Sequence, residues 1–339
     1  MQTDGTDGKI LKVKYPPITS YQTYANLLSV ILSNEDAYSW MFNILIQISK
    51  DSDIFCFSPK FTALNFAECP FLKVHKISRE LINRKWGSII RFVIDCIDLN
   101  DYIMILIDRA YIANYRMSSH WHDIFIYGYD LKNELFYTAD FFRGVYSYQT
   151  VSFDNFKNSY DKYDVDKYED WLDGAVLFKL ADAKYEFNIS SIKELLMDYY
   201  YSRNSDHRLI PFQVRFDKDK YDTDYKKNVY GMDCYKALAA HIIDENAEKH
   251  DIRPFHLFYD HKIAMVLLIK FLSKKEYLNE ASSLLEGYKL MQNKALSARN
   301  LMLKFRACEN PKIIDKVTDI IQAMEIHEKR LLHELLASI

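Results

Sequence analysis

Two histidines stand two residues apart at the start of an apolar run, in the stretch "SHWHDIFIYGYD" of residues 119–130. Imidazole gains and loses a proton near neutral pH, so it can serve as a general base, a general acid or a metal ligand. Alternate residues of a β-strand face the same side of a sheet. If this run is a strand, His120 and His122 share one face.

A second apolar run, "LFYTADFF", follows the polar segment "YDLKNE", and this pattern predicts a β-hairpin. A turn near Leu131 and Lys132 sets His122 opposite a position within one or two residues of Asp140. A carboxylate beside an imidazole fixes the tautomer of the ring and stabilises the imidazolium. The sequence therefore predicts a His122–Asp140 pair across neighbouring strands, which is half of a site for nucleophilic catalysis.

Two other interpretations of these residues stay open. His122 and Asp140 could be ordinary polar residues at strand ends, without a chemical role. Alternatively, His120, His122 and Asp140 could hold a metal ion through two nitrogens and one oxygen. That arrangement requires both histidines on one face and an open coordination position.

The segments before and after the hairpin are predicted from the spacing of their apolar residues. Before it we expect a loop and a helix from "ITSYQTYANLLSVILS", a buried helix from "DAYSWMFNILIQISKD", a loop between Pro59 and Pro70, a helical stretch from "ISRELINRKWGSIIRFVIDCIDL" and a strand from "DYIMILIDRAYI". After it, "GAVLFKLA" and "YEFN" predict further strands.

From about Ile189 onward the pattern is almost entirely helical, and Pro311 opens the last predicted helix at a first-turn position that tolerates proline. Helices, then strands, then helices indicate the α+β class. We expect an α+β core over residues 1–188 and a helical C-terminal region over residues 189–339.

The composition limits the classes of function. A chain of 339 residues that is 49% hydrophobic can form one large or two ordinary domains. Its net charge of −3 does not favour nucleic-acid binding or a polybasic membrane surface. No apolar run is long enough to span a bilayer, and no signal peptide is visible. Five scattered cysteines without a CxxC pair argue against disulfides and a zinc ribbon, so we expect a reduced, soluble, cytoplasmic protein.

Three stretches together resemble the butirosin biosynthesis protein H family, which has a papain-like core of the bacteriocin-processing-peptidase type. They are "HDIFIYGYD…FYTADF", "YGMDCYKALAAHI" and "DIRPFHLFYDHKIAMVLLIKFL". The first matches the strand that begins with the family's catalytic His and the strand that ends with its Asp. The other two resemble the helical C-terminal part of members encoded in nonribosomal peptide clusters. The resemblance covers about residues 15–275 and implies a papain-like cysteine-peptidase-type core with a helical C-terminal region.

The resemblance implies an acyltransferase of natural-product biosynthesis. Its partners would be an acyl or peptidyl carrier protein, which presents the group as a thioester on phosphopantetheine, and a small amine acceptor. No other cofactor, metal, nucleic acid or membrane is implied. A thiolate would take the acyl group, His122 would act as base and then acid, and Asp140 would orient the imidazole.

The sequence departs from the family at the nucleophile. The family places a Cys at the start of the first core helix, where the helix N-terminus lowers the thiol pKa. The matching segment "QTYANLLSVIL" contains no Cys. Thr23 stands at the family's Cys position, Ala25 is the alternative, and Gln22 could assist an oxyanion. Three explanations stay open: the Cys was substituted to inactivate the protein, the chain is a natural non-catalytic relative, or Thr23 or another cysteine serves as nucleophile.

Further residues are candidates around the same site. Tyr24, Tyr111 and Trp121 are predicted to bind substrate, and Tyr115 could line the same cleft. Asp108 and Arg109 end the strand before it, where we expect a surface ion pair.

The segment "DIRPFHLFYDHK" concentrates polar residues before an apolar helix, which we expect to open at His261 with Asp260 as a possible N-cap. It is predicted to form a capping and interdomain hydrogen-bond network, with a polar functional site as the alternative.

Carrier-dependent acyl or peptidyl transfer is therefore the function that we expect. A non-catalytic scaffold of the same fold that binds a carrier protein or ligand is the alternative. A metal-dependent hydrolase using His120 and His122 is a third possibility.

Overall fold

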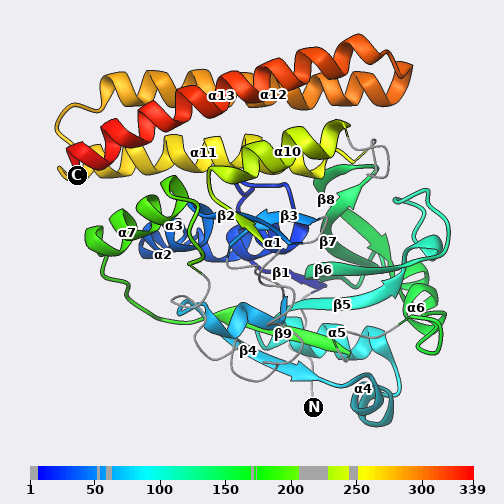
Figure 1. Ribbon diagram of the computed structural model, residues 1–339. Coiled ribbons are helices and arrows are strands. Elements are labelled where there is room, and N and C mark those ends of the chain that lie inside the picture. The colour runs from blue at the N-terminus through cyan, green and yellow to red at the C-terminus, as the bar shows by residue number, and fades with distance from the viewer. Residues whose placement is uncertain are drawn as a thin grey trace, which may run out of the picture. The chain divides into compact units, whose positions relative to one another are not determined.

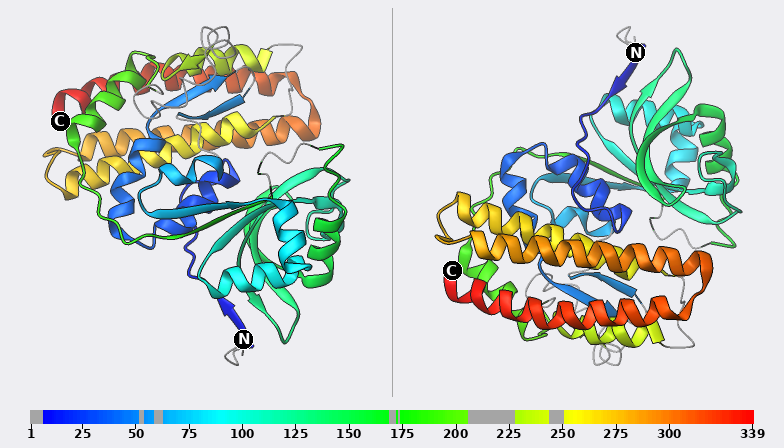
Figure 2. Two further views of the ribbon diagram at one scale, coloured as in Figure 1. Left: turned by 90° about the horizontal axis from the view of Figure 1, so that it is seen from below. Right: turned by 90° about the horizontal axis from the view of Figure 1, so that it is seen from above.

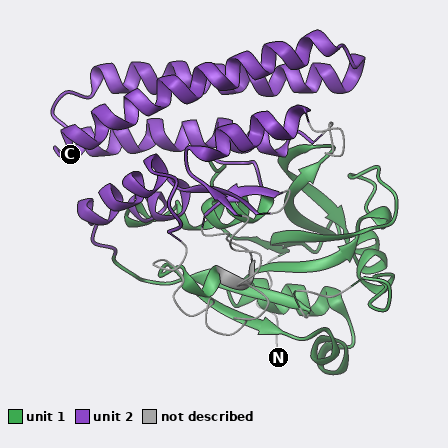
Figure 3. Cartoon of the chain, viewed as in Figure 1, with its two compact units in different colours: residues 1–16, 22–37, 62–184 green, residues 17–21, 38–61, 185–339 purple. Residues whose placement is uncertain are grey.

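The computed structural model describes residues 7–51, 54–58, 63–168, 172, 174–205, 228–243 and 251–339. Helices and strands both contribute substantially, which confirms the α+β class. The chain divides into two compact units (Figure 3). Unit 1 comprises residues 1–16, 22–37 and 62–184, and unit 2 comprises residues 17–21, 38–61 and 185–339. The predicted domain boundary after residue 188 stays a prediction, and the last division between the units follows residue 184.

Unit 1 is built on a seven-stranded sheet whose neighbouring strands are all antiparallel (Figure 1). The strands lie in the order β4 (Leu72–Ile77), β9 (Ala175–Leu180), β5 (Tyr102–Asp108), β6 (Trp121–Asp130), β7 (Leu135–Phe142) and β8 (Val145–Ser152). The short strand β1 (Gly8–Ile10) pairs with the second half of β6, beyond the residues that pair with β5.

Helices cover both faces of this sheet, which is why every residue of the apolar strand β5 is buried. On one face, Asn26 of α1 (Gln22–Ile31) accepts a hydrogen bond of 2.8 Å from Tyr146, and its amide lies 3.9 Å from the Sδ atom of Met104.

On the other face, α6 (Phe153–Asp161) packs Phe153 and Phe156 against Phe136, with ring centroids 4.5 and 5.0 Å apart. The alternation of side chains along the strands supports the placement of α1 and α6 on opposite faces. Met104 and Ala139 both pair with Phe125, so they share its face, and Phe136 alternates to the opposite one.

The stretch predicted as helical before β5 contains two helices, α4 (Arg79–Trp86) and α5 (Ile89–Asp98). Ser78 caps α4 by accepting a hydrogen bond from the backbone N–H of Leu81. Gly87 ends it in the left-handed conformation, with φ of 63°. Because that conformation breaks the helical path, α5 begins as a separate element.

Two sequence-based predictions are wrong in detail. The stretch predicted as one helix after residue 35 holds α2 (Glu35–Trp40), α3 (Phe42–Leu45) and then the strand β2 (Ile48–Asp51). Tertiary pairing decides this, because β2 lies between β3 (Ile54–Phe57) and β10 (Val229–Tyr230) in a three-stranded sheet of unit 2. The "YEFN" segment, predicted as a strand, has no regular structure. The sequence patterns also do not predict β1, β3, β4, β8 or β10.

From Ile189 onward, the described part of unit 2 is mainly helical, as predicted. The helices described there are α7 (Ile189–Tyr200), α10 (Asp233–Ile243), α11 (Arg253–Lys274), α12 (Ser282–Cys308) and α13 (Pro311–Ser338). The three longest, α11, α12 and α13, run alongside one another, with α12 in contact with both of the others (Figure 2). Pro311 occupies the first turn of α13, and Asn310 caps it through the Lys312 N–H, which confirms the predicted start. Within the described part of the chain, no helix combines the length and apolarity needed to cross a membrane.

Candidate functional site

The β6–β7 hairpin confirms the predicted turn and brings His122 and Asp140 together. Phe125 lies opposite Ala139, and this pair is the last of the ladder between the two strands. His122 and Asp140 lie beyond it, on the face of the sheet that α6 covers. The Nε2 atom of His122 lies 3.1 Å from Oδ1 and 2.9 Å from Oδ2 of Asp140. A side-chain contact thus joins the strands where their backbone pairing has ended.

This contact assigns the imidazole tautomer. A carboxylate only accepts hydrogen bonds, so Nε2 of His122 carries the proton and donates it. The other nitrogen, Nδ1, makes no hydrogen bond to the residues that the structure describes. The His122 side chain is 23% exposed, whereas Asp140 is 1% exposed. In neutral His122, Nδ1 therefore keeps a lone pair that could accept a proton from a substrate.

Asp140 receives two further hydrogen bonds that support its buried carboxylate. Tyr115 donates its phenolic hydroxyl to Oδ2, and the backbone N–H of Phe141 donates to Oδ1 over 2.6 Å. Buried carboxylates are costly unless such donors replace the lost water. With His122, three donors converge on this one side chain, which fixes its orientation.

The charges around His122 determine its basicity. Burial lowers the pKa of His122, but the negative charge and hydrogen bond of Asp140 outweigh burial, and the pKa lies above its usual 6.5. Asp123 acts in the same direction as Asp140, and Arg109 opposes them. Burial also raises the pKa of Asp123 above its usual 3.8, although the neighbouring His122 lowers it. The imidazolium is thus stabilised by a buried anionic environment.

The loop that carries Tyr115 is closed at its base by Asp108. This buried carboxylate accepts a 2.6 Å hydrogen bond from the Ser119 hydroxyl and a 3.3 Å bond from the backbone N–H of His120. Arg109 donates its Nε–H to the carbonyl of Ser118 over 3.2 Å. The surface ion pair expected for Asp108 and Arg109 is therefore wrong, because both side chains instead tie the two ends of residues 108–120 together.

Helix α1 carries the residues predicted at the nucleophile position. Thr23 is half-buried, and Ala25 is fully buried. Gln22 donates its side-chain amide to the backbone carbonyl of Asp123 over 3.1 Å, which places the first turn of α1 against β6. The body of α1 packs on the face of Met104, opposite the face that carries the imidazole. A role for Thr23 or Ala25 in chemistry stays a prediction.

The predicted substrate-binding residues differ in exposure. Tyr24 is 2% exposed, and Tyr111 is 42% exposed at the end of the 3₁₀ helix η2 (Arg109–Tyr111). Trp121 is half-buried at the first position of β6, with its ring 5.4 Å from the ring of His120. Tyr111 and Trp121 are therefore accessible enough to contact a ligand, whereas Tyr24 is buried in the core.

The three-ligand metal set predicted as an alternative does not form. His120 precedes β6 and lies against Trp121 and Tyr168, whereas His122 faces Asp140. Across the described ranges, no group of three or more His, Cys, Asp or Glu side chains is placed to hold a metal ion.

The cysteines differ in accessibility. Cys56, Cys69, Cys96 and Cys234 are buried, and Cys308 is exposed. Burial raises the pKa of both Cys69 and Cys96, the two cysteines of unit 1, to about 12. A thiol with such a pKa is almost entirely protonated at neutral pH and is a poor nucleophile.

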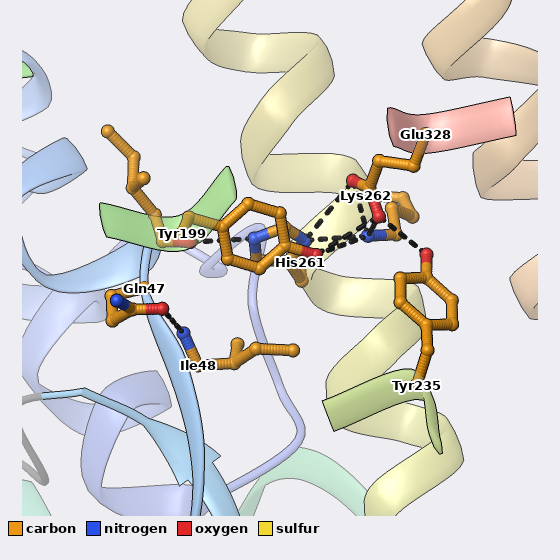
Figure 4. Close-up of polar contacts among 8 residues, drawn as sticks. Gln47, Ile48, Tyr199, Tyr235, His261, Lys262 and Glu328 are labelled. Carbon is orange, nitrogen blue, oxygen red and sulfur yellow. Dashed lines mark hydrogen bonds and ion pairs between the residues drawn. The ribbon is translucent and has the colours of Figure 1, made fainter. Parts of the chain in front are cut away.

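A second polar cluster lies in unit 2 and includes part of the "DIRPFHLFYDHK" segment (Figure 4). Lys262 donates to both carboxylate oxygens of Glu328, over 2.6 and 2.5 Å. Tyr199 and Tyr235 also donate to Glu328, over 3.0 and 2.6 Å. His261 accepts from Lys262 over 2.9 Å and donates to the carbonyl of Ile46 over 2.7 Å. The four residues His261, Lys262, Glu328 and Tyr199 are fully buried.

The predicted helix start at His261 is wrong, because α11 begins at Arg253. Pro254 suits the first turn of a helix, and the chain from there is continuously helical. Asp260 is therefore not an N-cap. Its Oδ2 atom instead accepts hydrogen bonds of 2.6 Å from the backbone N–H groups of Thr19 and Ser20. The segment therefore does form a hydrogen-bond network, but Asp260 is not a cap in it, and Thr19 and Ser20 belong to unit 2 as Asp260 does, so the interdomain part of the prediction stays a prediction.

Comparison with known proteins assigns no family, because neither a protein-family model nor a curated protein matches the chain.

Proposed function

We propose that the chain transfers an acyl or peptidyl group from a carrier-protein thioester to a small amine in natural-product biosynthesis. The observation that carries this proposal is the state of His122, whose Nε2 is held by buried Asp140 while Nδ1 has no partner among the described residues. The papain-like core and the carrier protein are supported by the resemblance of residues 15–275 to the butirosin biosynthesis protein H family.

The proposed reaction is direct attack of the amine on the thioester. The amine nitrogen forms a bond to the carbonyl carbon, and the carbon–sulfur bond breaks. Nδ1 of His122 takes the proton that the amine loses and returns it to the departing thiolate, so the products are an amide and a free phosphopantetheine thiol. Asp140 stabilises the imidazolium between these two steps.

A direct transfer is favoured over an acyl-enzyme intermediate. Helix α1 offers no Cys, and its body packs on the sheet face opposite the imidazole. The two cysteines of unit 1 are buried and protonated. A general base alone supplies about 10²- to 10⁴-fold of rate, which is sufficient for a thioester, an acyl donor that is already activated.

The test is a transfer assay with acyl-loaded carrier protein and a primary amine. Amide formation is followed by mass spectrometry, together with the intact mass of the chain. We expect amide product, no acylated chain, and a loss of about 10²- to 10⁴-fold in rate for His122→Ala. The matched control is His120→Ala, which removes an imidazole two residues away that does not contact Asp140. An acyl adduct on the unmodified chain would overturn the direct mechanism.

A carrier-binding scaffold without chemistry is the second candidate, and the missing Cys in the segment that matches the family's nucleophile helix favours it. The same assay separates the two functions. Carrier binding without amide formation, unchanged by His122→Ala, would support the scaffold. Thr23→Cys and Ala25→Cys variants extend the test, since an acyl adduct that requires His122 would show that this part of α1 reaches the site.

A further inference from the structure

Tyr115, in the loop of residues 108–120, contacts both His122 and Asp140. It is 2% exposed, and its hydroxyl donates to Oδ2 of Asp140. Its ring meets the imidazole of His122 edge to face, with centroids 5.3 Å apart and an interplanar angle of 89°. The same ring packs on Phe142 at 4.8 Å. One side chain therefore contacts both members of the pair.

The position of Tyr115 is set by the surrounding loop. Asp108 binds Ser119 and His120, so the loop begins and ends at the same point of the sheet. Tyr115 lies between these ends, and its backbone N–H donates to the carbonyl of Ile112 over 3.1 Å. Compact loops with joined ends hold their inward side chains in a fixed place. The loop thus positions the Tyr115 hydroxyl to donate to the Asp140 carboxylate, which also accepts from His122 and the Phe141 N–H.

We propose that Tyr115 is a positioning residue that holds Asp140 against Nε2 of His122 and moderates the negative charge that the imidazole experiences. The inference rests on the proposed function only in taking His122 as the base. A donor to a carboxylate withdraws part of its charge, so the same carboxylate stabilises an imidazolium less strongly. Tyr115 would in this way keep His122 basic enough to take a proton and acidic enough to release it.

The chemical state of Tyr115 supports this role. Burial raises the pKa of its phenol well above 10, and the charge of Asp140 raises it further, so the hydroxyl remains a donor across the working pH range. The other charges that act on His122 are Asp140 and Asp123, which favour the imidazolium, and Arg109, which opposes it. A substitution of Tyr115 leaves these three charged residues in place, so a shift of the His122 pKa can be attributed to the loss of the Tyr115 hydroxyl.

The experiment measures the pKa and tautomer of His122 by NMR in the chain labelled with ¹⁵N-histidine, with the signal assigned through His122→Gln. In Tyr115→Phe we expect an upward shift of the His122 pKa and a mixture of neutral tautomers in place of Nε2–H alone. Transfer at a pH below the His122 pKa should fall by roughly three- to tenfold, the equilibrium equivalent of one hydrogen bond, and recover at high pH. A merely structural role would lower the rate equally at every pH.

Two variants separate the hydrogen bond from packing. Phe142→Leu loosens the ring under Tyr115 but keeps its hydroxyl, and Tyr137→Phe removes a hydroxyl from the same strand as Asp140. Neither should shift the His122 pKa. Site-specific 3-fluorotyrosine at position 115 keeps the fold and strengthens the donor, so it should shift the His122 pKa downward, and it replaces Tyr115→Phe should that variant not fold.

The outcomes distinguish this inference from the proposed function. An unchanged His122 pKa in both Tyr115 variants overturns the inference, even if His122→Ala abolishes transfer. Opposite shifts in the two variants support it, even if no amide is formed and the transfer function fails.

Discussion

His122 in unit 1 and His261 in unit 2 both lie in buried polar clusters with a carboxylate, yet their environments are opposite. His261 is fully buried, and both of its nitrogens are hydrogen-bonded, to Ile46 and Lys262. His122 is 23% exposed, and among the described residues only its Nε2 has a hydrogen-bond partner. A histidine whose two nitrogens are occupied has no capacity left for a substrate. Unused hydrogen-bonding capacity, rather than residue type or a nearby acid, therefore separates a candidate base from a structural histidine.

The two rings also differ in the charge nearest to them. Burial lowers the pKa of His261 well below 6.5, and the adjacent Lys262 lowers it further. Burial likewise lowers the pKa of His122, but Asp140 reverses the direction of the shift. His261 therefore stays neutral and acts as an acceptor for Lys262, whereas His122 is poised to carry a proton.

The largest expected effect is on the stability of unit 2. Lys262→Met leaves Glu328 as an uncompensated buried carboxylate and should reduce the free energy of unfolding by about 3–5 kcal/mol. Adding Glu328→Gln removes that charge and keeps an acceptor for Tyr199 and Tyr235, so the double variant should recover much of the loss. Chemical denaturation of the two single variants and the double variant measures the coupling. If the double variant lost the sum of the two single losses of unfolding free energy, Lys262 and Glu328 would not be energetically coupled.

The two histidines provide a crossed pair of substitutions. His261→Ala should cost about 2–4 kcal/mol of stability, because it creates a cavity, leaves the Ile46 carbonyl without its donor and removes one acceptor from Lys262. His122→Ala should cost less stability than His261→Ala, because the His122 ring is partly exposed and Tyr115 and Phe141 still donate to Asp140, while transfer falls by about 10²- to 10⁴-fold. Thermal unfolding and the transfer assay measure both. Equal losses of stability at the two positions would remove the contrast between the clusters.

The pH dependence of stability should have opposite signs for the two rings. The folded-state pKa of His122 is raised, so its stabilising contribution is complete below pH 6.5 and is lost as the pH rises through the folded value. The folded-state pKa of His261 is lowered, so its contribution is present above pH 6.5 and is lost as the pH falls.

Denaturation of His122→Gln and His261→Gln between pH 5 and 8 isolates these slopes. The free energy of unfolding of His122→Gln, measured relative to the native chain, should increase as the pH rises. The amount by which His261→Gln is less stable than the native chain should become smaller as the pH falls. The same sign in both variants would contradict the assignment.

The smallest effect is expected from the thiols. A thiol reagent should modify Cys308 in the native chain and reach Cys56, Cys69, Cys96 and Cys234 only after denaturation. Because Cys308 ends α12 in unit 2 and no cysteine of unit 1 is exposed, modification should leave transfer within about twofold of the native rate. Loss of transfer on modifying a single native thiol would identify a cysteine nucleophile and overturn the direct mechanism.

Much of the candidate site followed from local patterns. The hairpin was predictable because the alternation of "HDIFIYGYD" and the polar turn after it determine strands and register together. The register in turn placed His122 near Asp140. Tyr115 was recognisable only as a residue that could line the cleft, since its contact with Asp140 depends on a loop closed by Asp108.

The predictions that failed did so where distant segments decide the local structure. Strand β2 reads as a continuation of a helix until β3 and β10 pair with it. Likewise, Lys262 and Glu328 are 66 residues apart, and no local pattern joins them.

Local sequence patterns were enough to predict the α+β class, the long helices of unit 2 and the His122–Asp140 pair, because periodicity and turn chemistry act over short distances. The folded arrangement was needed to show that His122, but not His261, keeps a nitrogen without a partner among the described residues. It was also needed to show which carboxylate is compensated and which face of the sheet α1 covers. Those properties depend on burial and on partners brought from elsewhere in the chain, and desolvation then converts their arrangement into charge and reactivity.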